Sequence, residues 1–369
     1  MSKSWIEGLN RAESGLNLLK REKRGTSITL LLMLLLLLVC LTACNRDQHS
    51  DVNGSNGNSS ASELITIHMA SWSKPITEQV NVLAAEHEGW FANRGIQFQF
   101  IPGAGSSDAI KNIISGQADI AFADPFSVYA ALAKGEKLKI IYNIYPQNVF
   151  NVVSLKESGI EKLADLKGKT IGVYSLASGT YFHLLLLLHE AGLTEDDVTI
   201  VETGVLNFAP LMQGQVDATA ATDTGLADAR LKGIGEVNVI EVKDYLNVPS
   251  DLFVVTEETY NNRKQDLQRF LEVYQQSAQW MIDQPEAAAA IAKQHAIDGI
   301  DEERNLQMIE LRNTATVDEL TEKQGLGALD SELLQLGADR FWELGLLDRQ
   351  LELQKVIVTD LLPGVVEKE

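Results

Sequence analysis

Two segments of the sequence, roughly a hundred residues apart, end in a carboxylate after the same pattern. Residues 116–124 have the sequence GQADIAFAD, and residues 214–223 have GQVDATAATD, with one residue inserted. In each, a glycine ends a helix and a short, largely apolar strand follows. Asp124, and Asp223 with Thr222 before it, therefore stand at strand ends, where a carboxylate can accept amino or ring N–H donors. The alternative is that each Asp only caps the helix that follows.

Hydroxyl side chains gather at two other junctions between a strand and a helix. Ser106 and Ser107 follow the glycine-rich turn 102–105, and Ser178 and Thr180 follow another apolar strand. The free N–H groups of a helix N-terminus bind anions and polarised carbonyl groups. These residues therefore suit a sulfonate, a carboxylate or a carbonyl group, unless they do no more than cap their helices.

Two aromatic residues near these polar groups could stack on a flat ligand ring. Trp72 and Ser73 lie in the loop after the first predicted strand, 64–69, and Tyr181 follows Thr180 directly. An aromatic side chain offers a large apolar face to such a ring. The alternative is that Trp72 and Tyr181 pack on the surface of their lobes without touching a ligand.

The residues offer little to an enzymatic mechanism. The six histidines are scattered, and His183 and His189 are not on one helix face at the spacing of a metal site. No His-Glu-x-x-His, Gly-x-Ser-x-Gly or phosphate-loop motif is present. We therefore expect no catalytic residue, metal or cofactor, and we predict a protein that binds a small molecule rather than an enzyme. A structural or adhesive protein, which needs no shared cleft, is the third possibility.

The elements that position these residues alternate between strand and helix, which predicts an α/β fold with mainly parallel sheets flanked by helices. Four strands and three helices are predicted first, at 64–69, 77–93, 95–101, 106–116, 118–123, 126–134 and 138–142. A second sheet and an apolar helix are predicted at 149–155, 169–174, 182–191, 198–202, 216–220 and 237–242.

Two sheets of this kind predict two lobes that face each other across a cleft and are joined by crossing strands. Residues 63–150 are expected to form the first part of lobe 1, and residues 151–249 to form lobe 2. A strand at 252–255 crosses back, so residues 250–369, nearly all helical in pattern, should pack against lobe 1. The predicted apolar anchors of this part are Phe270, Tyr274, Trp280, Phe341 and Trp342.

The N-terminal segment is typical of a targeting signal. Basic residues precede an apolar run at 30–41, which is shorter than the ~20 residues of a membrane span. The run ends in LTAC, which resembles the lipobox of bacterial lipoproteins. This resemblance implies that residues 1–43 are a signal peptide and that a lipid on Cys44 anchors the protein; the alternative is an uncleaved signal anchor. Residues 44–62, rich in Gly, Ser and Asn, are expected to be a flexible tether.

Charge and cysteine content restrict the partners. The sequence has 31 Lys and Arg against 51 Asp and Glu, a net charge of −20, and no basic cluster follows Cys44. Nucleic acids and anionic lipid surfaces bind clustered Lys and Arg, so neither is an expected partner. The only other cysteine, Cys40, lies in the predicted signal peptide, so no disulfide is expected in the mature chain.

Beside the lipobox, three segments carry a resemblance to a known family: GAGSSDAIKNIISGQADIAFAD, LADLKGKTIGVYSLASGTYFHLLL and GQVDATAATD. Over residues 64–343 the chain resembles the ABC-transporter substrate-binding proteins of the nitrate, alkanesulfonate, taurine and thiamine-pyrimidine-precursor family. The resemblance implies a periplasmic-binding-protein-like fold whose two lobes close on a small molecule. It also implies an extracytoplasmic monomer that delivers this molecule to ABC permease subunits.

The carboxylates favour a nitrogen heterocycle, and the resemblance suggests a thiamine pyrimidine precursor or a riboflavin-like compound. Taurine, an alkanesulfonate or nitrate is the alternative ligand in the same role. The alternative of a different class is an enzyme of thiamine pyrimidine synthesis, but such enzymes carry a cysteine-rich motif that the mature chain lacks. The predicted ligand-binding residues are Trp72, Ser73, Ser106, Ser107, Asp124, Ser178, Thr180, Tyr181, Thr222 and Asp223.

Overall fold

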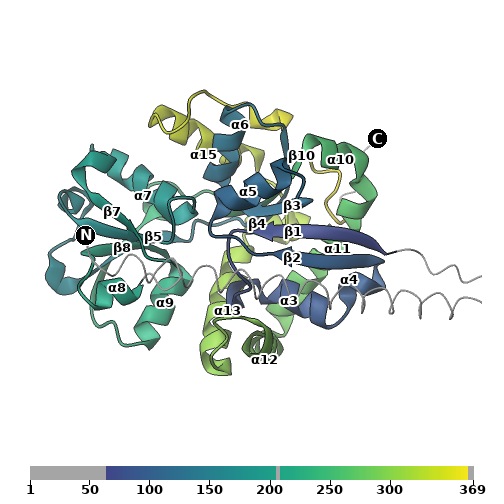
Figure 1. The fold of residues 1–369 in the computed structure, drawn as a ribbon, viewed down its shortest axis with the longest axis horizontal. Helices are drawn as coiled ribbons and strands as arrows, with labels where there is room; N and C mark the ends of the chain where they lie inside the picture. Colours follow the sequence, from purple (N-terminus) through teal and green to yellow (C-terminus); the bar gives the residue numbers. More distant parts are fainter. Residues whose placement is uncertain (1–63, 205–207, 365–369) are drawn as a thin grey trace, which may run out of the picture. The chain divides into compact units, whose positions relative to one another are not determined.

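The computed structural model describes residues 64–204 and 208–364. The predicted signal peptide, Cys44 and the tether therefore lie outside the described residues. The described chain forms two five-stranded sheets, each flanked by helices (Figure 1). We call the sheet that holds the first strand, with its helices, lobe 1, and the other sheet with its helices lobe 2. Within the described ranges, no helix is long and apolar enough to cross a membrane.

The sheet of lobe 1 combines strands from both ends of the described chain. They are β1 (Ile65–Ser71), β2 (Ile96–Ile101), β3 (Ile120–Ala123), β4 (Leu138–Tyr145) and β10 (Asp251–Thr256). The order is β2-β1-β3-β10-β4. The pairs of β1 with β2 and β3 are parallel, whereas β10 is antiparallel to both β3 and β4. Every residue of β3 is buried, as expected for a central strand covered on both faces.

The sheet of lobe 2 repeats this arrangement. Its strands are β5 (Phe150–Leu155), β6 (Thr170–Val173), β7 (Thr199–Glu202), β8 (Ala218–Thr222) and β9 (Val237–Glu241). The order is β7-β6-β8-β5-β9. β6 pairs in parallel with β7 and β8, and β5 is antiparallel to β8 and β9.

The two sheets exchange one strand each. β5 enters lobe 2 directly after β4 of lobe 1, and β10 returns to lobe 1 after β9 of lobe 2. Each exchanged strand takes the fourth place in its sheet and runs against the other four. The chain therefore crosses between the lobes twice, and the expected fold class, two mainly parallel sheets hinged by crossing strands, is confirmed.

The helices before and between the crossings follow the predicted pattern except near residue 89. In lobe 1 they are η1 (Thr77–Gln79), α3 (Val80–His87), α4 (Trp90–Asn93), α5 (Ser106–Ile114) and α6 (Pro125–Ala133). In lobe 2 and at its exit they are η2 (Lys156–Ser158), η3 (Leu163–Leu166), α7 (Gly179–Glu190), η4 (Glu195–Asp197), α8 (Phe208–Met212), α9 (Asp223–Leu231) and η5 (Val242–Asp244). The prediction of one helix over 77–93 is wrong, because Gly89 adopts a left-handed φ of 71° and separates α3 from α4.

The chain after β10 is helical, as predicted. Its helices are α10 (Glu257–Asn262), α11 (Lys264–Asp283), α12 (Pro285–His295), α13 (Glu302–Thr316), α14 (Glu319–Gln324), α15 (Ser331–Glu343) and η6 (Leu353–Lys355). Phe270, Tyr274 and Phe341 are buried anchors, and the ring of Trp280 packs edge-on against that of Trp90. The prediction for Trp342 is wrong, since this side chain is 40% exposed. Phe341 takes the inward direction on α15, and the next residue is turned about 100° away from it.

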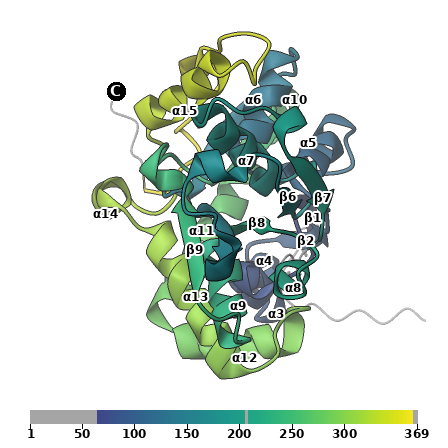
Figure 2. The ribbon, with the colours of Figure 1, turned by 90° about the vertical axis from the view of Figure 1, so that its left-hand side faces the viewer.

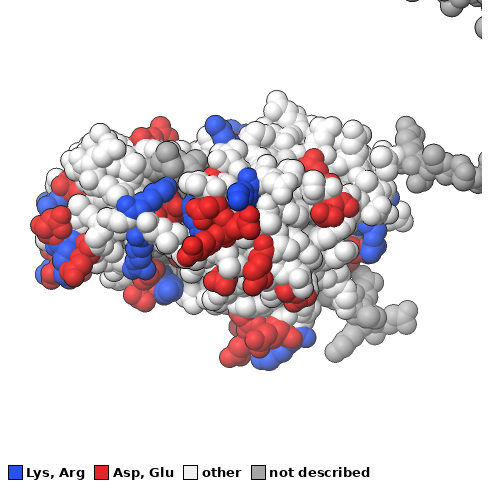
Figure 3. All heavy atoms as spheres, turned by 90° about the horizontal axis from the view of Figure 1, so that it is seen from below, with Lys and Arg blue, Asp and Glu red and all other residues white. Residues whose placement is uncertain are grey.

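The C-terminal helices contact both lobes. α11 packs against α3 of lobe 1, whereas α13 also packs against α9 of lobe 2. Figure 2 shows α9, α12 and α13 gathered at the lower end of the view. The expectation that this part packs against lobe 1 must therefore be extended, because α13 joins the two lobes. Seen from below, acidic and basic side chains are interspersed on the surface (Figure 3).

Candidate ligand-binding site

A cavity of about 100 Å³ lies between the two lobes. A single water needs only about 10–15 Å³, so the space suffices for several waters or for one small organic molecule. Both lobes and helix α13 contribute to its wall. The lining residues are Trp72, Ile76, Glu78, Ser106, Asp124, Val149, Phe150, Tyr174, Ser178, Gly179, Thr180, Thr222, Gly225, Asp251 and Arg312.

At one side of the cavity, the loop before α5 in lobe 1 touches the loop before α7 in lobe 2. The Ser107 amide donates to the carbonyl of Ala177 at 3.1 Å, and the Ser175 hydroxyl donates to the carbonyl of Ala104 at 2.5 Å. Gly105 lies so close that a Cβ atom there would stand 2.5 Å from the Ala177 oxygen. The lobes are therefore in direct contact, and the structure represents a closed arrangement of the two.

Asp124 lies between strand β3 and helix α6, as the sequence predicts. It is the N-cap of α6: its carboxylate accepts from the Ser127 amide at 3.0 Å and from the Ser127 hydroxyl at 2.8 Å. Its own amide donates to the hydroxyl of Ser106 at 2.9 Å. Burial raises the pKa of the Asp124 carboxyl, although the hydrogen bonds with Ser106 and Ser127 oppose this shift. The capping alternative therefore describes Asp124 in this structure, and the residue also lines the cavity.

Asp251 is a second buried carboxylate at the cavity, and the sequence analysis missed it. It opens β10 at the point where the chain re-enters lobe 1, beside an irregularity in the pairing with β4. Its side chain makes no hydrogen bond or ion pair with any other described residue. Burial, followed by the charge of Asp124, raises its pKa well above the ordinary value; Arg312 opposes the shift and Glu78 adds to it.

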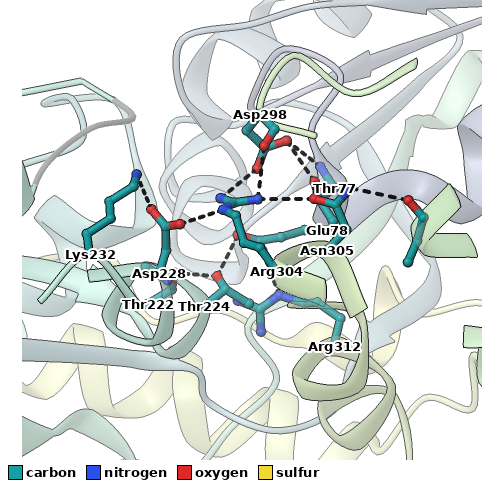
Figure 4. A network of polar contacts seen from close by, with 12 residues as sticks. Thr77, Glu78, Thr222, Thr224, Asp228, Lys232, Asp298, Arg304, Asn305 and Arg312 are labelled. Carbon is teal, nitrogen blue, oxygen red and sulfur yellow. Dashed lines mark hydrogen bonds and ion pairs between the residues drawn. The ribbon is translucent and has the colours of Figure 1, made fainter. Parts of the chain in front are cut away.

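Arg312 of α13 reaches into the cavity wall and connects the lobes (Figure 4). Its Nε donates to Glu78 of lobe 1 at 2.6 Å, and its Nη2 contacts Asp223 at 2.7 Å and Thr224 at 2.9 Å, both in lobe 2. The guanidinium is buried, yet Nη1 has no partner among the described residues. Burial works to lower the pKa of Arg312, but the charges of Asp223 and Glu78 outweigh it and keep the group protonated.

A second arginine of α13 joins the lobes outside the cavity. Arg304 donates through Nε to Asp228 of α9 at 2.5 Å, and through Nη1 to the carbonyl of Asp298 at 2.9 Å (Figure 4). Asp228 also pairs with Lys232 within lobe 2 at 2.6 Å. The two arginines lie eight residues apart on one helix, so α13 presents both toward lobe 2.

The hydroxyl groups of lobe 2 form a compact cluster at the start of α7. Ser178 and Thr180 share a hydrogen bond of 2.8 Å, Ser178 also donates to the carbonyl of Ser175 at 2.6 Å, and Thr180 accepts from the amide of Tyr174 at 3.0 Å. Between the two hydroxyls, Gly179 is in contact with Phe150: a Cβ there would lie 2.5 Å from the ring. A glycine is therefore required where the helix meets the first strand of lobe 2.

Trp72 forms part of an aromatic wall. Its ring packs edge-on against Phe122, with centroids 6.4 Å apart, and against Tyr174 of lobe 2, with centroids 6.2 Å apart. Its indole Nε1 is buried and has no hydrogen-bond partner among the described residues. Such an orphaned donor is costly in a folded structure.

Of the ten predicted binding residues, six line the cavity: Trp72, Ser106, Asp124, Ser178, Thr180 and Thr222. Ser73 and Ser107 do not. The Ser73 hydroxyl donates to the Lys74 carbonyl at 2.8 Å, and the Ser107 hydroxyl lies 3.5 Å from that of Ser127. Ser107 contributes to the contact between the lobes through its backbone instead.

Tyr181 and Asp223 also lie outside the lining. The Tyr181 hydroxyl donates to Glu195, and its ring packs against Phe182. The ring is therefore not placed at the cavity, where the sequence predicts that it stacks on a ligand. The reason is helical geometry, since Thr180 takes the cavity direction and the following residue is rotated away. Asp223 forms an ion pair with Arg312 and so contributes to the contact between the lobes.

The lining residues missed by the sequence analysis that carry charge are Glu78, Asp251 and Arg312. One feature of the sequence could have identified Asp251 as a candidate site residue, namely a carboxylate at the start of an otherwise apolar strand. Glu78 lies in the three-residue helix η1 and Arg312 within α13, and neither residue gave a local signal. Within residues 64–204 and 208–364, no group of three or more His, Cys, Asp or Glu is placed to hold a metal ion.

Solved structures show the same fold. The alkanesulfonate-binding protein SsuA from Xanthomonas axonopodis pv. citri, bound to MOPS, superposes with a TM-score of 0.65 at 17% identity, covering 81% of this chain and all of that one. The periplasmic aliphatic sulphonate binding protein SsuA from Escherichia coli gives a TM-score of 0.62 at 17% identity, covering 79% of this chain and 97% of that one. The chain therefore has the periplasmic-binding-protein-like fold that the sequence predicts.

Relatives by sequence carry two kinds of names. The riboflavin-binding protein RibY of Chloroflexus aurantiacus is 23% identical over 285 residues, 76% of this chain and 81% of that protein. A 4-amino-5-hydroxymethyl-2-methylpyrimidine phosphate synthase of Aspergillus parasiticus is 28% identical over 171 residues, 45% of this chain and 46% of that one, less than half of its length. Residues 76–288, more than half of the chain, match the family described as NMT1/THI5 like. The resemblance found in the sequence is confirmed, and the chain belongs to the NMT1/THI5-like family.

Proposed function

We propose that this protein is the extracytoplasmic, monomeric substrate-binding component of an ABC importer, which captures a small molecule between its lobes and delivers it to permease subunits. The observation that carries this proposal is the cavity, which is lined by both lobes and exists only where they meet. In a site divided between two lobes, binding of the ligand is coupled to closure of the lobes. A carrier requires this coupling, because it must later open and release the ligand.

We infer that the ligand is a nitrogen heterocycle with N–H donors, such as a thiamine pyrimidine precursor. The lining holds three acidic side chains, Glu78, Asp124 and Asp251, against one basic side chain, Arg312. Such a balance disfavours an anion and favours a neutral or cationic molecule that donates hydrogen bonds. The aromatic rings of Trp72 and its neighbours suit a flat ligand.

The size of the cavity supports a small heterocycle. About 100 Å³ is below the range of roughly 300–1,000 Å³ that is usual for pockets of drug-sized ligands. In this closed arrangement the space therefore favours one aromatic ring over the three fused rings of a flavin. One sequence relative is named for riboflavin and the other for a pyrimidine, and both of these compounds are nitrogen heterocycles.

A sulfonate, taurine or nitrate is the alternative ligand in the same role. The Nη1 atom of Arg312 and the hydroxyls of Ser178 and Thr180 support it, because these groups can bind an anion. Two of the three Arg312 nitrogens are already engaged by carboxylates, however, which leaves little positive charge for an added anion. We therefore place the anion second.

Anchoring through Cys44 completes the proposal. It rests on the lipobox resemblance alone, because Cys44 lies outside the described residues. A tether of residues 44–62 would let the folded part reach its permease while the lipid holds it at the membrane.

A thermal-shift screen of the ligand-free protein tests the function. The panel contains 4-amino-5-hydroxymethyl-2-methylpyrimidine, riboflavin, taurine, an alkanesulfonate and nitrate. A ligand present at a hundred times its Kd stabilises the folded protein by about 2.7 kcal/mol, so a true ligand raises the melting temperature clearly. Stabilisation by the pyrimidine supports the proposal, whereas stabilisation by the anions alone moves the ligand to the second class. Conversion of the pyrimidine or of a precursor to a new product would instead indicate an enzyme.

A further inference from the structure

Among the polar groups of the residues that line the cavity, three without a partner within the described residues are the carboxylate of Asp251, the indole Nε1 of Trp72 and the guanidinium Nη1 of Arg312. The other polar side chains of the wall that the sequence singles out, such as Ser106 and Asp124, are already hydrogen-bonded. Buried polar groups in folded proteins are nearly always satisfied, so orphaned ones at a cavity indicate what a bound molecule must supply.

The carboxylate of Asp251 is the only acceptor among the three. The residue is 94% buried, since its exposed fraction is 6%, and it lies near the carboxylate of Asp124. Asp124 has its own donors in Ser127, so it does not need the ligand to the same degree. A buried carboxylate without a hydrogen-bond donor carries a desolvation cost that only the charge of Arg312 offsets here. This position therefore needs an N–H or O–H donor from outside the described residues.

The other two groups are donors. The Nε1 of Trp72 and the Nη1 of Arg312 each have a hydrogen that no described residue accepts. Both atoms are buried behind the surface of the cavity wall, so Asp251 is the one of the three groups that a bound molecule can reach without a change in the wall.

We propose that Asp251 is the specificity-determining residue of this site, and that it selects ligands that present an N–H donor to its carboxylate. An amino group next to a ring nitrogen, as in a 4-aminopyrimidine, combines donor and acceptor on one edge. A nitrate or an alkanesulfonate offers acceptors only and leaves the carboxylate unsatisfied. This inference rests on the proposed binding function and assigns its selectivity to a residue.

The test compares two probes and three variants by calorimetric titration. The probes are 4-amino-2-methylpyrimidine and 2,4-dimethylpyrimidine, which differ by a methyl group in place of the amino group. Losing a hydrogen bond to a charged partner corresponds to roughly a ten- to hundred-fold loss of affinity. We expect the wild-type protein to prefer the amino compound by this factor, and D251N to lose most of the preference.

Asp217→Asn is the matched control. Asp217 precedes a strand of lobe 2, accepts from the Thr170 amide at 2.7 Å and does not line the cavity, so D217N should keep the wild-type affinities. Asp124→Asn separates the two cavity carboxylates. If D124N loses more of the preference for the amino compound than D251N does, the selecting residue is Asp124 and the inference is overturned.

The melting temperature of the ligand-free variants guards against a folding artefact. The raised pKa of Asp251 means that its charged form is disfavoured in the folded protein, so D251N should melt at or above the wild-type temperature at pH 7. Should D251N fail to fold, the comparison of the two probes on the wild-type protein still decides: equal affinities would refute a donor requirement. If neither probe binds the wild-type protein and an anion does, it is the proposed ligand class that fails.

Discussion

The ion pair between Arg304 and Asp228 offers a direct test of how the lobes are held together. Arg304 belongs to α13 and Asp228 to α9 of lobe 2, and neither residue lines the cavity. Their side chains are only 11% and 17% exposed, with an Nε to Oδ1 distance of 2.5 Å. Burial works to raise the pKa of Asp228, but the hydrogen bonds from Lys232 and Arg304 lower it overall, so the carboxylate is charged at neutral pH. We predict that D228N shifts the protein toward an open arrangement.

The magnitude follows from the burial of the pair. Ion pairs on an exposed surface contribute only about 0–1 kcal/mol, but hydrogen bonds to charged groups in less exposed places contribute about 1.5–3 kcal/mol. Asn keeps the shape of the side chain and one acceptor, so we take the lower value, about 1.5 kcal/mol. This corresponds to roughly a tenfold change in the ratio of closed to open protein. Because ligand binding requires closure, the Kd should rise by up to the same factor.

Two measurements check this prediction. Calorimetric titration gives the Kd for the best ligand of the screen, and small-angle scattering gives the radius of gyration without ligand. K232A is the matched control: Lys232 pairs with Asp228 inside lobe 2, so its loss leaves the bond between the lobes in place. An unchanged Kd in D228N, or an equally large change in K232A, would show that the ion pair does not hold the lobes closed.

Two further predictions concern the contact between the loops and the membrane anchor. G105A should weaken ligand binding and enlarge the protein in scattering, because its Cβ would meet the Ala177 carbonyl at 2.5 Å; G116A, which has a φ of +74° but open space, should leave binding unchanged. If G105A binds as wild type, the two loops do not approach as closely in solution. C44S should move the protein from the detergent phase to the aqueous phase in a partitioning assay, whereas C40S should not. Equal partitioning of both variants with wild type would contradict lipidation at Cys44.

Much of the topology was predictable because the pattern of each element is local. β2 and β5 begin within one residue of their predicted starts and end where predicted, since apolar runs bounded by glycine or polar residues define them. The break at Gly89 was not predicted, because a glycine inside an amphipathic pattern either interrupts a helix or is tolerated in it. The sequence does not reveal which outcome applies until the packing of α4 against β2 is known.

The candidate site was predictable only in part, for a physical reason. Four of the lining residues lie at junctions between a strand and a helix, and such junctions can be recognised from the neighbouring residues. They are Ser106, Asp124, Ser178 and Thr180. Arg312, by contrast, reaches the cavity across 234 residues of sequence to pair with Glu78. Nothing in the helical pattern of α13 distinguishes this arginine from one that faces solvent.

The position of Arg312 suggests why recognition and closure are inseparable in this protein. One of its nitrogens holds Glu78 of lobe 1, a second holds Asp223 and Thr224 of lobe 2, and the third is buried without a partner among the described residues. The guanidinium is therefore held in the wall of the cavity only while the first two nitrogens bridge the lobes. A ligand that fills the cavity between the lobes stabilises the same closed arrangement, so binding favours closure, and by reciprocity closure favours binding. A change that weakens the bridge should consequently lower affinity even when it touches no ligand atom.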